Sequence, residues 1–345
     1  MTDQSEIEVG IDPAPSEGWD ELVASDPRSS FCHLSGWANV LRGTLSLEPL
    51  FIEARRGDRI VAGMPLYRMP RLLSGTVLVS MPYLNYGGPI GDPSALPLLV
   101  ERAVEEARRG GDRRLEVRSR RALGAGMGGG RDKVTVVLPL PDDPATLFED
   151  GFKSKLRSQI RRPIKEGMEA RLGPEQLEAF YHVFSRNMRD LGTPVLPAPF
   201  FERILEEFPD IVRFGAVYHG GEPVSAGCGF HWMDEFEMTW ASSLQEHNRL
   251  APNMLLYWSF MERCIEEGAK RFNFGRCTPG GGTHRFKRQW GGEDEPLSWT
   301  QWPDSADVED GSSRFFELAT SVWSRLPLPV TNRLGPMLAR RLPAF

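Results

Sequence analysis

The alternation of hydrophobic and polar residues predicts the same series of elements twice along the chain. The first half predicts a hairpin, a strand, a helix and a strand, at Phe51–Ala54 with Arg59–Tyr67, Val77–Ser80, Leu96–Arg109 and Arg114–Arg118. The second half repeats that order at Arg213–Tyr218 with Glu222–Phe230, Phe236–Trp240, Met254–Glu267 and Arg271–Phe274. The pattern therefore predicts an α/β (α+β) protein made of two related domains.

A short sequence match supports this repeat. Gly57–Gly63 (GDRIVAG) aligns with Gly221–Gly227 (GEPVSAG) at a constant offset, 221 − 57 = 164, which is close to half of the 345 residues. We therefore expect Gly63 and Gly227 to occupy equivalent places in two related hairpins. The predicted organisation is a first domain at 1–145, a second domain with a basic N-terminal segment at 146–305, and an amphipathic C-terminal tail at 306–345.

The stretch Arg271–Gly292 (RFNFGRCTPGGGTHRFKRQWGG) combines a strand, a glycine-rich connection and a polar turn. Phe286 and Trp290 are four residues apart, so one helical turn would anchor both on one face and point Lys287 elsewhere. A cation held on an anchored turn can stabilise negative charge that develops during a reaction. The alternative interpretation is a solvated basic turn with two aromatic anchors. We expect Lys287 to be exposed at a cleft of the second domain.

Composition places the chain among globular proteins, with 40% hydrophobic and 26% charged residues. The net charge of −6 argues against binding nucleic acid through the whole surface but leaves local basic patches open. The polar N-terminus and the lack of long apolar runs predict a cytoplasmic protein without a signal peptide or membrane span. The scattered cysteines predict free buried thiols, and no metal site is expected because the histidines form no His-x-x-x-His pair.

A local excess of positive charge lies in Phe152–Arg171. Its candidate phosphate-binding side chains are Lys155, Arg157, Arg161 and Arg162, and the alternative is a solvated helix kinked or broken near Pro163. The tail, Ser312–Phe345, intersperses arginines with apolar residues. It could rest on an anionic membrane surface, as a peripheral contact, or pack on its own domain, which we favour.

Four stretches together resemble the FemABX family: FKSKLRSQIRR, FSRNMRDLGTP, WASSLQEHNRLAPNMLLYW and FNFGRCTPGGGTHRFKRQWG. The resemblance is closer to FemAB-related proteins associated with the PEP-CTERM/exosortase system and exopolysaccharide clusters. It implies two tandem GNAT-like domains, similar to acyl-CoA N-acyltransferases, followed by a C-terminal helical tail. It also implies aminoacyl-tRNA as the donor and, as the acceptor, an envelope or polysaccharide precursor linked to a nucleotide or lipid.

The resemblance also implies residue roles. Lys287 falls on the lysine of the family's Phe-Lys motif, which is implicated in catalysis, and Phe286 is its neighbour. Family members bind acceptor phosphates with basic residues, for which Arg186 or Arg189 lies in the matching helix, Glu175–Asp190. From the residues themselves, His284 is a candidate proton acceptor or an ordinary loop histidine. Tyr257 and Asn253 are expected to line the cleft on the helix opposite, with core packing as the alternative for Tyr257, and Arg276 is a further substrate-binding candidate. The family's Gly-Phe-Gly is replaced here by Gln289-Trp290-Gly291.

Three functions compete. The first is an acyltransferase that moves an aminoacyl group to an amine or hydroxyl of a cell-envelope or exopolysaccharide precursor and needs no cofactor. Because such an ester arrives activated, the protein must only orient two substrates and stabilise the oxyanion, a role we assign to Lys287. The second is an acetyl-coenzyme A-dependent GNAT enzyme, which is disfavoured because Asn248–Asn253 has no glycine and Pro252 has no N–H for the pyrophosphate. The third is a non-enzymatic scaffold in the exopolysaccharide/exosortase pathway.

Overall fold

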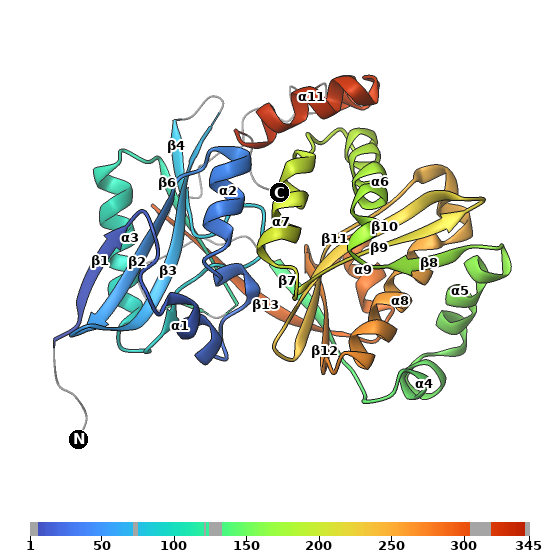
Figure 1. Ribbon diagram of the computed structural model, residues 1–345, viewed down its shortest axis with the longest axis horizontal. Helices are drawn as coiled ribbons and strands as arrows, with labels where there is room; N and C mark the ends of the chain where they lie inside the picture. Colours follow the sequence, from blue (N-terminus) through green and yellow to red (C-terminus); the bar gives the residue numbers. More distant parts are fainter. Residues whose placement is uncertain (1–5, 72–74, 121, 124–132, 304–318, 342–345) are drawn as a thin grey trace. The chain divides into compact units, whose positions relative to one another are not determined.

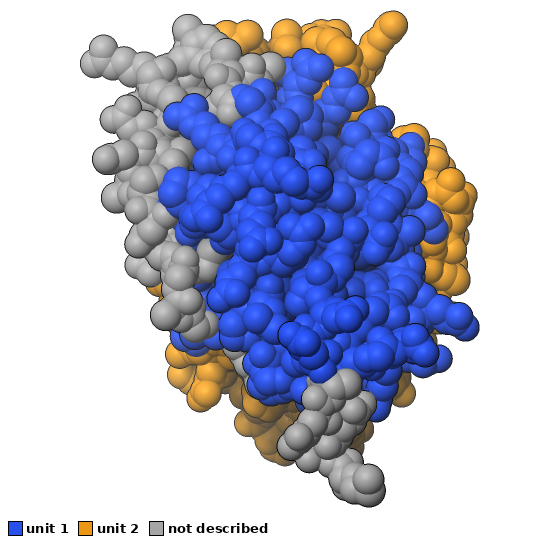
Figure 2. Space-filling model, turned by 90° about the vertical axis from the view of Figure 1, so that its left-hand side faces the viewer, with its two compact units in different colours: residues 1–133, 296–308, 338–345 blue, residues 134–295, 309–337 orange. Residues whose placement is uncertain are grey.

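The computed structural model describes residues 6–71, 75–120, 122–123, 133–303 and 319–341 (Figure 1). The chain divides into two compact units, coloured separately in Figure 2. Unit 1 contains residues 1–133, 296–308 and 338–345, and unit 2 contains residues 134–295 and 309–337. Each unit is a twisted sheet with helices packed on both of its faces.

Unit 1 is organised around the sheet order β1-β2-β3-β4-β6-β13, with β5 paired to β3. All neighbouring strands in this sheet are antiparallel except β4 and β6, which are parallel. Its strands are β1 (Glu8–Asp12), β2 (Pro49–Arg56), β3 (Arg59–Pro70), β4 (Thr76–Val79), β5 (Ile90–Gly91), β6 (Arg114–Ser119) and the C-terminal part of β13 (Glu293–Trp302). Its helices are α1 (Trp19–Ser25), a short 3-10 turn (Phe31–His33), α2 (Trp37–Leu45) and α3 (Leu96–Arg109).

The two faces of the unit 1 sheet carry different helices. Ala62 and Met64 of β3 belong to the core beneath α3, together with Leu99 and Ala103 of that helix. Gly63, between them, faces the other side, where a Cβ atom would lie 2.5 Å from the ring of Trp19 in α1. Successive residues of a strand point to opposite faces, so α1 covers the face opposite α3.

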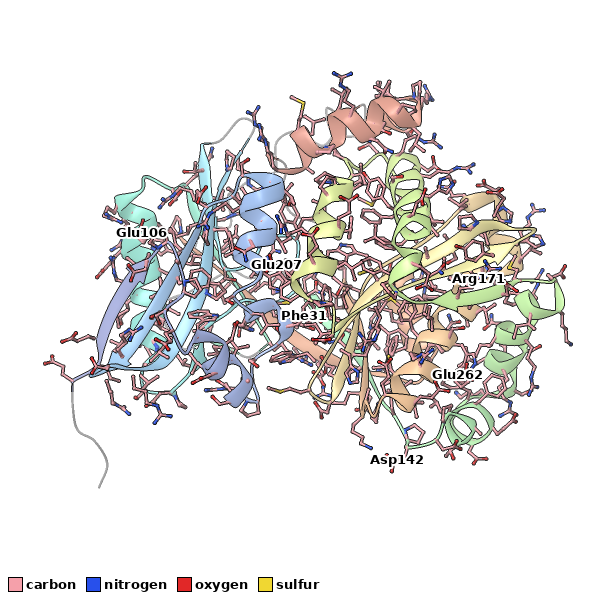
Figure 3. All side chains as sticks on the ribbon, in the orientation of Figure 1. Phe31, Glu106, Asp142, Arg171, Glu207 and Glu262 are labelled. Atoms are coloured by element: carbon pink, nitrogen blue, oxygen red, sulfur yellow. The ribbon has the colours of Figure 1, made fainter. Side chains whose placement is uncertain are left out.

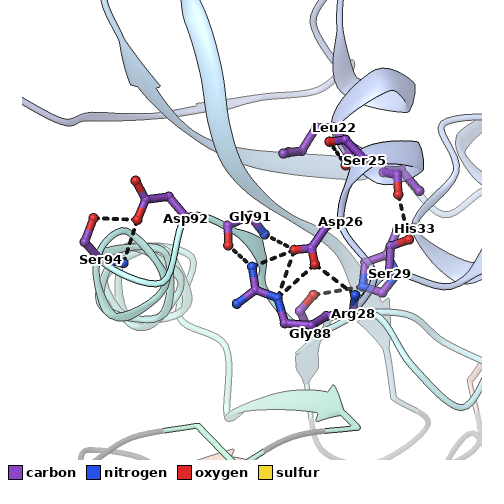
Figure 4. Close-up of polar contacts among 11 residues, drawn as sticks. Leu22, Ser25, Asp26, Arg28, Ser29, His33, Gly88, Gly91, Asp92 and Ser94 are labelled. Carbon is purple, nitrogen blue, oxygen red and sulfur yellow. Dashed lines mark hydrogen bonds and ion pairs between the residues drawn. The ribbon is translucent and has the colours of Figure 1, made fainter. Parts of the chain in front are cut away.

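A buried polar network ties the segment after α1 to β5 (Figure 4). The Asp26 carboxylate accepts a hydrogen bond from the backbone N–H of Gly91 at 2.5 Å and pairs with Arg28 at 2.7 Å. Burial raises the pKa of Asp26, but the bonds from Arg28 and Gly91 outweigh burial, and the net direction is downward. Nearby, Nε2 of the buried His33 bonds to the Gly88 carbonyl at 3.0 Å. These bonds satisfy a backbone donor of the short strand β5 and a carbonyl of the loop before it.

Unit 2 has the sheet order β7-β12-β11-β10-β9-β8. Its strands are β7 (Lys133–Pro139), β8 (Glu169–Leu172), β9 (Val212–His219), β10 (Glu222–Trp232), β11 (Glu235–Ser243) and β12 (Arg271–Cys277). Its helices are α4 (Pro144–Thr146), a π-helical turn (Leu147–Gly151), α5 (Ser154–Lys165), α6 (Leu177–Asp190), α7 (Ala198–Glu207), α8 (Pro252–Glu266), α9 (Gly282–Arg288) and α11 (Leu328–Ala339). Short 3-10 turns lie at Pro174–Gln176 and Gln245–Leu250.

Helices α5 and α8 cover one face of this sheet, and α6 and α7 cover the other. The core on the first face joins Leu156 and Ile160 of α5 to Phe260 of α8 and to β7, β11 and β12. The second face is aromatic: Phe180 of α6 packs edge-on against Phe201 of α7 and Phe214 of β9. The predicted break near Pro163 does not occur, because α5 continues through the buried proline to Lys165.

Each unit receives its last strand from the other half of the sequence. β7 pairs antiparallel with β12 in unit 2, and Ser298–Trp302 of β13 pair antiparallel with β6 in unit 1. The units therefore differ from the predicted ranges 1–145 and 146–305, since sequence order alone does not reveal that two strands are exchanged. Of the predicted tail, 306–345, the structure describes 319–341; residues 319–337 belong to unit 2, with α11 through Met337, and residues 338–341 to unit 1.

The repeated hairpin is present in both units, but the predicted residue equivalence is wrong. Ala54 pairs with Ala62 in unit 1, and Val217 pairs with Ser225 in unit 2, so equivalent residues differ by 217 − 54 = 163. A Cβ on Gly227 would meet Phe260 of α8, whereas Gly63 faces away from the corresponding helix α3. The sequence match at offset 164 is therefore one residue out of register with the structural repeat at offset 163. A shift of one residue along a strand places the side chain on the opposite face of the sheet.

All four cysteines are free and buried, as the sequence predicted. None of the helices in the described part of the chain has the length and apolar character needed to span a bilayer.

Candidate active site

The candidate site lies where β11 and β12 separate. These parallel strands pair over three positions only, from Glu235 with Arg271 to Glu237 with Asn273. Beyond that point β11 continues to Ser243 and β12 to Cys277 without pairing to each other. Two parallel strands that diverge leave backbone donors and acceptors for another molecule.

The buried side-chain amide of Asn273 lies at the point where β11 and β12 separate. Asn273 Oδ1 accepts hydrogen bonds from the backbone N–H of Gly275 at 2.8 Å and from the Thr135 hydroxyl of β7. Asn273 Nδ2 donates to the Glu235 carboxylate at 3.0 Å and lies 3.5 Å from that of Glu237. Fully paired buried polar networks of this kind hold a single backbone arrangement.

The Asn273 network holds a bulge in β12. Asn273 pairs with Val137 and Arg276 with Thr135, so β12 has one more residue than β7 over this interval. Gly275 lies in the bulge with φ +71°, which is left-handed backbone that favours glycine. The carbonyls of Gly275, in the bulge, and of Arg276, directly after it, both accept hydrogen bonds from Lys287.

Lys287 is the central charged residue of the site. Its Nζ donates to Gly275 O at 2.7 Å and to Arg276 O at 2.9 Å. The side chain is 5% exposed, so the prediction of an exposed lysine is wrong. The spacing predicted that Phe286 and Trp290 would face the core while Lys287 pointed elsewhere. In the structure Lys287 also points toward β12, where its ammonium bonds to two carbonyls. Burial lowers the pKa of Lys287 to about 8, against the opposing effects of Cys277 and Glu237.

The ammonium group retains capacity for a further partner. A protonated lysine has three N–H donors, and two of them bond to the backbone carbonyls of β12. At neutral pH the group is mostly protonated, because its pKa remains above 7. Lys287 can therefore direct a positive charge and one donor at an oxygen that becomes negative.

Aromatic side chains pack the α9 segment against α8 and β12. Trp290 is buried and Phe286 is half-buried, and both rings contact Tyr257 of α8, at centroid distances of 6.0 and 5.1 Å. Tyr257 also stacks on Phe274 at 5.7 Å. Burial raises the pKa of Tyr257, which is part of the core, so its predicted place on the wall of a cleft is wrong. Asn253, in the first turn of α8, is half-buried.

His284 is engaged at both ring nitrogens. Nδ1 accepts a hydrogen bond from the Gly280 N–H at 3.1 Å, which leaves Nε2 to donate to the Asp294 carboxylate at 2.9 Å. These bonds connect the glycine-rich connection, α9 and β13. A role as proton acceptor would require one of the two bonds to break.

The two candidate arginines of α6 differ in their surroundings. Arg186 pairs with Glu246 at 2.6 Å, and Arg189 pairs with its neighbour Asp190 at 2.6 Å. Between them, Asn187 donates to the Ser242 hydroxyl at the end of β11 at 3.1 Å. The C-terminal half of α6 therefore lies beside the part of β11 that has left β12.

Glu149 lies close to two of the four candidate phosphate-binding side chains of the basic segment and not to the other two. Arg161 pairs with Glu149 at 3.2 Å, and Arg157 donates to the Phe152 carbonyl at 2.8 Å and lies 3.9 Å from the Glu149 carboxylate. Lys155 and Arg162 are exposed and have no ion pair in the described part of the chain. At the end of the segment, Arg171 lies on β8 (Figure 3), paired with Glu169 and stacked on the ring of Tyr218 at 4.5 Å.

Sequence reasoning missed several residues of the site: Asn273, Gly275 as a bulge, Glu237 and Thr135. Asn273 and Glu237 could have been found in the sequence, because each is a polar residue within a largely apolar strand, and such exceptions often mark functional sites. Thr135 could not have been found, because its contact with Asn273 depends on the exchange of β7.

The described residues of unit 1 are arranged differently at the corresponding point. Its parallel strands also pair at three positions, ending with Val79 and Glu116, so Glu116 corresponds to Asn273 and Arg118 to Gly275. Arg118 stays in register with Trp299 of β13, and its guanidinium donates to the carbonyls of Met81 and Leu84. A large buried side chain thus stands in unit 1 where unit 2 has a glycine bulge.

Comparisons with known proteins agree with this architecture. Residues 153–288 match the model of the acetyltransferase (GNAT) domain. The chain is 25% identical over 272 residues to the UDP-N-acetylmuramoylpentapeptide-lysine N(6)-alanyltransferase of Weissella viridescens, covering 70% of this chain and 78% of that protein.

Solved structures show the same fold. A crystal structure of FemX has a TM-score of 0.64 at 15% identity, over 85% of this chain and 97% of that one. A tandem GNAT protein from the clavulanic acid biosynthesis pathway has a TM-score of 0.56 at 14% identity, over 86% and 97%. The predicted tandem GNAT-like fold is therefore confirmed, as is the prediction of an acyltransferase related to aminoacyltransferases.

Proposed function

We propose that this protein transfers an aminoacyl group to an amine or hydroxyl of a cell-envelope precursor. The observation that carries the proposal is the placement of Lys287, whose ammonium is held by two carbonyls at the point where β11 and β12 separate. The alanyltransferase from Weissella viridescens supports the substrate class, because its name specifies an alanyl group and a lysine of a muramoylpentapeptide.

In the proposed reaction the acceptor nitrogen or oxygen attacks the ester carbonyl of an aminoacyl-tRNA. A C–N or C–O bond forms, the ester C–O bond breaks, and the ribose hydroxyl leaves with a proton. Negative charge develops on the carbonyl oxygen, and the ammonium of Lys287 stabilises it in a site largely removed from water. We assign His284 to positioning α9, since its two nitrogens bond to Gly280 and Asp294.

Other residues receive supporting roles. Arg276, half-buried beside Lys287, and Asn253, at the start of α8, would contact the donor or acceptor. Arg186 or Arg189 would hold an acceptor phosphate after exchanging its carboxylate partner. Lys155 and Arg162 would contact the tRNA backbone. Arg157 and Arg161 would hold the start of α5 through Phe152 and Glu149.

The sequence supports a finer proposal for the substrate class. The stretches that resemble FemAB-related proteins of the PEP-CTERM/exosortase system favour an exopolysaccharide precursor as the acceptor. Mass spectrometry of envelope and polysaccharide precursors from cells with and without the gene tests this proposal. A precursor that loses the mass of one aminoacyl residue in the deletion strain is the expected result, and unchanged precursors would reject it.

The donor is tested with purified protein. Radiolabelled aminoacyl-tRNA should pass its label to an acceptor fraction, and acetyl-coenzyme A should not bind, because Ala251-Pro252 replaces a glycine turn at the start of α8. Saturable micromolar binding of acetyl-coenzyme A in calorimetry would favour the acetyltransferase function instead.

The tail packs on unit 2, where Gly335 lies against Val195, as the sequence favours. We also propose that the face left exposed by this packing contacts an anionic membrane surface. Val330, Leu334 and Met337 of α11 form a stripe at helical spacing and are 38, 42 and 58% exposed. Arg333 lies beside them and is exposed. Vesicles containing phosphatidylglycerol should bind the protein, and Leu334→Ser with Met337→Ser should abolish that binding; equal binding by the double variant would reject a role of the tail.

A further inference from the structure

Unit 1 contains a concentration of arginine side chains that the proposed reaction does not use. Arg114, Glu116 and Arg118 alternate along β6, whereas Leu115 and Val117 between them belong to the core beneath α3. The three charged residues therefore share the face opposite α3. Arg71, which follows β3, lies within electrostatic reach of all three of them.

The loop after β4 and the end of the described chain add to this cluster. Tyr83 donates a hydrogen bond to the Ala339 carbonyl at 3.2 Å and lies within electrostatic reach of Arg71, Arg118 and Arg340. Its backbone has φ +66°, an unfavourable conformation for a tyrosine. We call Arg71, Arg114, Arg118, Arg340 and Glu116 the arginine cluster.

Positive charge in the arginine cluster exceeds negative charge. Glu116 pairs with Arg118 at 2.7 Å and lies 3.7 Å from Arg114. Within the described part of the chain, no other acidic side chain forms an ion pair with any of the four arginines. Four guanidinium groups thus face one carboxylate. Burial and the neighbouring arginines lower the pKa of Arg71 against the opposing effects of Glu116 and Tyr83, as expected where positive charge is in excess.

Three guanidinium nitrogens of the cluster have no partner. Arg71 Nη1, Arg114 Nε and Arg340 Nε are each buried without a hydrogen bond. Arg114 is only 9% exposed, and Arg71 and Arg340 are half-buried. A buried charged donor without an acceptor destabilises the fold, and a ligand that supplies an acceptor removes that cost. Arg118, in contrast, is satisfied by Glu116, by two carbonyls and by the face of Trp299, 4.3 Å away.

We propose that Arg71, Arg114 and Arg340 form a binding site for a phosphate group of a small ligand. A phosphate presents oxygens in several directions and carries up to two negative charges, so it can pair with guanidinium groups supplied by three segments of the chain that lie near one another. A carboxylate, planar and singly charged, would leave more of the excess positive charge uncompensated than a phosphate would. Arg118 and Glu116 are positioning residues that hold the loop after β4 and the Arg114 side chain.

The proposal does not rest on the proposed transfer reaction, because none of the contacts that carry it involves Lys287 or a residue bonded to it. Two sources could supply the phosphate: a soluble phosphoester or diphosphate, or the headgroup of an anionic lipid. Inorganic pyrophosphate represents the first source, and glycerol 3-phosphate represents the second.

Calorimetry with the full chain tests the site. Pyrophosphate or glycerol 3-phosphate should bind saturably at one site per chain. Arg71→Gln and Arg340→Gln should each weaken binding by about 10- to 100-fold, the range for loss of a charge-assisted hydrogen bond. Arg59→Gln and Arg113→Gln remove exposed arginines from β3 and from the position before β6 and should bind like the wild type. Tighter binding of pyrophosphate indicates the soluble source, and tighter binding of glycerol 3-phosphate indicates the headgroup.

Thermal unfolding provides a second readout. Removal of an unpaired charge should leave the melting temperature of Arg71→Gln unchanged or raised without ligand, and only the wild type and the two controls should gain stability from the phosphate probe. The absence of saturable binding in the wild type would overturn the proposal. Wild-type affinity in both Arg71→Gln and Arg340→Gln would also overturn it, because the phosphate would then bind elsewhere.

Discussion

The Nζ atom of Lys287 lies 2.7 Å from the carbonyl oxygen of Gly275, so a cation on α9 is fixed to the bulge of β12. The same bulge is held from its other side by Asn273 Oδ1, 2.8 Å from the Gly275 N–H. The Lys287 ammonium and the β12 bulge that orients it are therefore joined by hydrogen bonds on both sides of Gly275. Substitution of Lys287 removes the charge and leaves the bond from Gly275 to Asn273 in place.

Removal of the charge should affect transfer first. In Lys287→Met most of the apolar stem remains and the ammonium is lost, so aminoacyl transfer should fall by about 10²- to 10³-fold, as when one oxyanion donor is removed. Initial rates with labelled aminoacyl-tRNA measure the effect. Lys270→Met, at an exposed lysine paired with Asp142, is the matched control and should keep wild-type rates. Unchanged turnover in Lys287→Met would reject the catalytic assignment.

The low pKa of Lys287 predicts how stability depends on pH. The pKa is about 8 in the folded protein and 10.5 without the fold, so between these values the unfolded chain binds more protons. The wild type should therefore gain stability relative to Lys287→Met as pH rises from about 8 to 10.5, by about 3 kcal/mol in total. Denaturant unfolding of both proteins across this range measures the difference. A constant difference would show that burial does not shift the lysine.

Activity should change in the opposite direction over the same pH range. If the protonated lysine stabilises the oxyanion, transfer should decline as pH rises above about 8, because the ammonium is lost. A rate that rises through pH 8 would instead indicate that neutral Lys287 accepts a proton. The rate profile, corrected for spontaneous ester hydrolysis, distinguishes these roles.

The order of elements was predictable from the sequence, because strands and helices with one buried face have regular hydrophobic spacing. The buried state of Lys287 was not, since spacing places Phe286 and Trp290 on one face but does not show that the bulge at Gly275 offers two carbonyls. Tyr257 was assigned to a cleft for the same reason: its neighbours Phe274 and Trp290 come from distant segments. The exchange of β7 and β13 leaves no local signal at all.

The offset of 163 residues between the two hairpins, which places Gly63 and Gly227 on opposite faces of their sheets, can be tested by substitution. A Cβ on Gly63 would lie 2.5 Å from Trp19, a buried ring fixed by its bond to the His33 carbonyl, whereas a Cβ on Gly227 would meet the flexible Met238 sulfur at 3.0 Å. Gly63→Ala should destabilise the protein by about 1–3 kcal/mol, and Gly227→Ala by clearly less. Equal losses in urea unfolding would show that the two glycines have equivalent surroundings after all.

The basic segment gives the last prediction, because Glu149 divides it into two classes of side chain. Lys155 and Arg162 are exposed and unpaired within the described residues, so each can contact a phosphate without losing a partner. Arg161 would first have to leave Glu149, and Arg157 would have to leave the Phe152 carbonyl. If this segment binds tRNA, Lys155→Gln with Arg162→Gln should weaken binding more than Arg157→Gln with Arg161→Gln. Each lost phosphate contact should also reduce the slope of log affinity against log salt by about 1. Filter binding at several salt concentrations measures both quantities, and Glu149→Gln, which releases Arg161, should strengthen binding at low salt. The same affinity and slope in all of these proteins would assign the segment to the solvated surface of α5 and leave tRNA to another part of the chain.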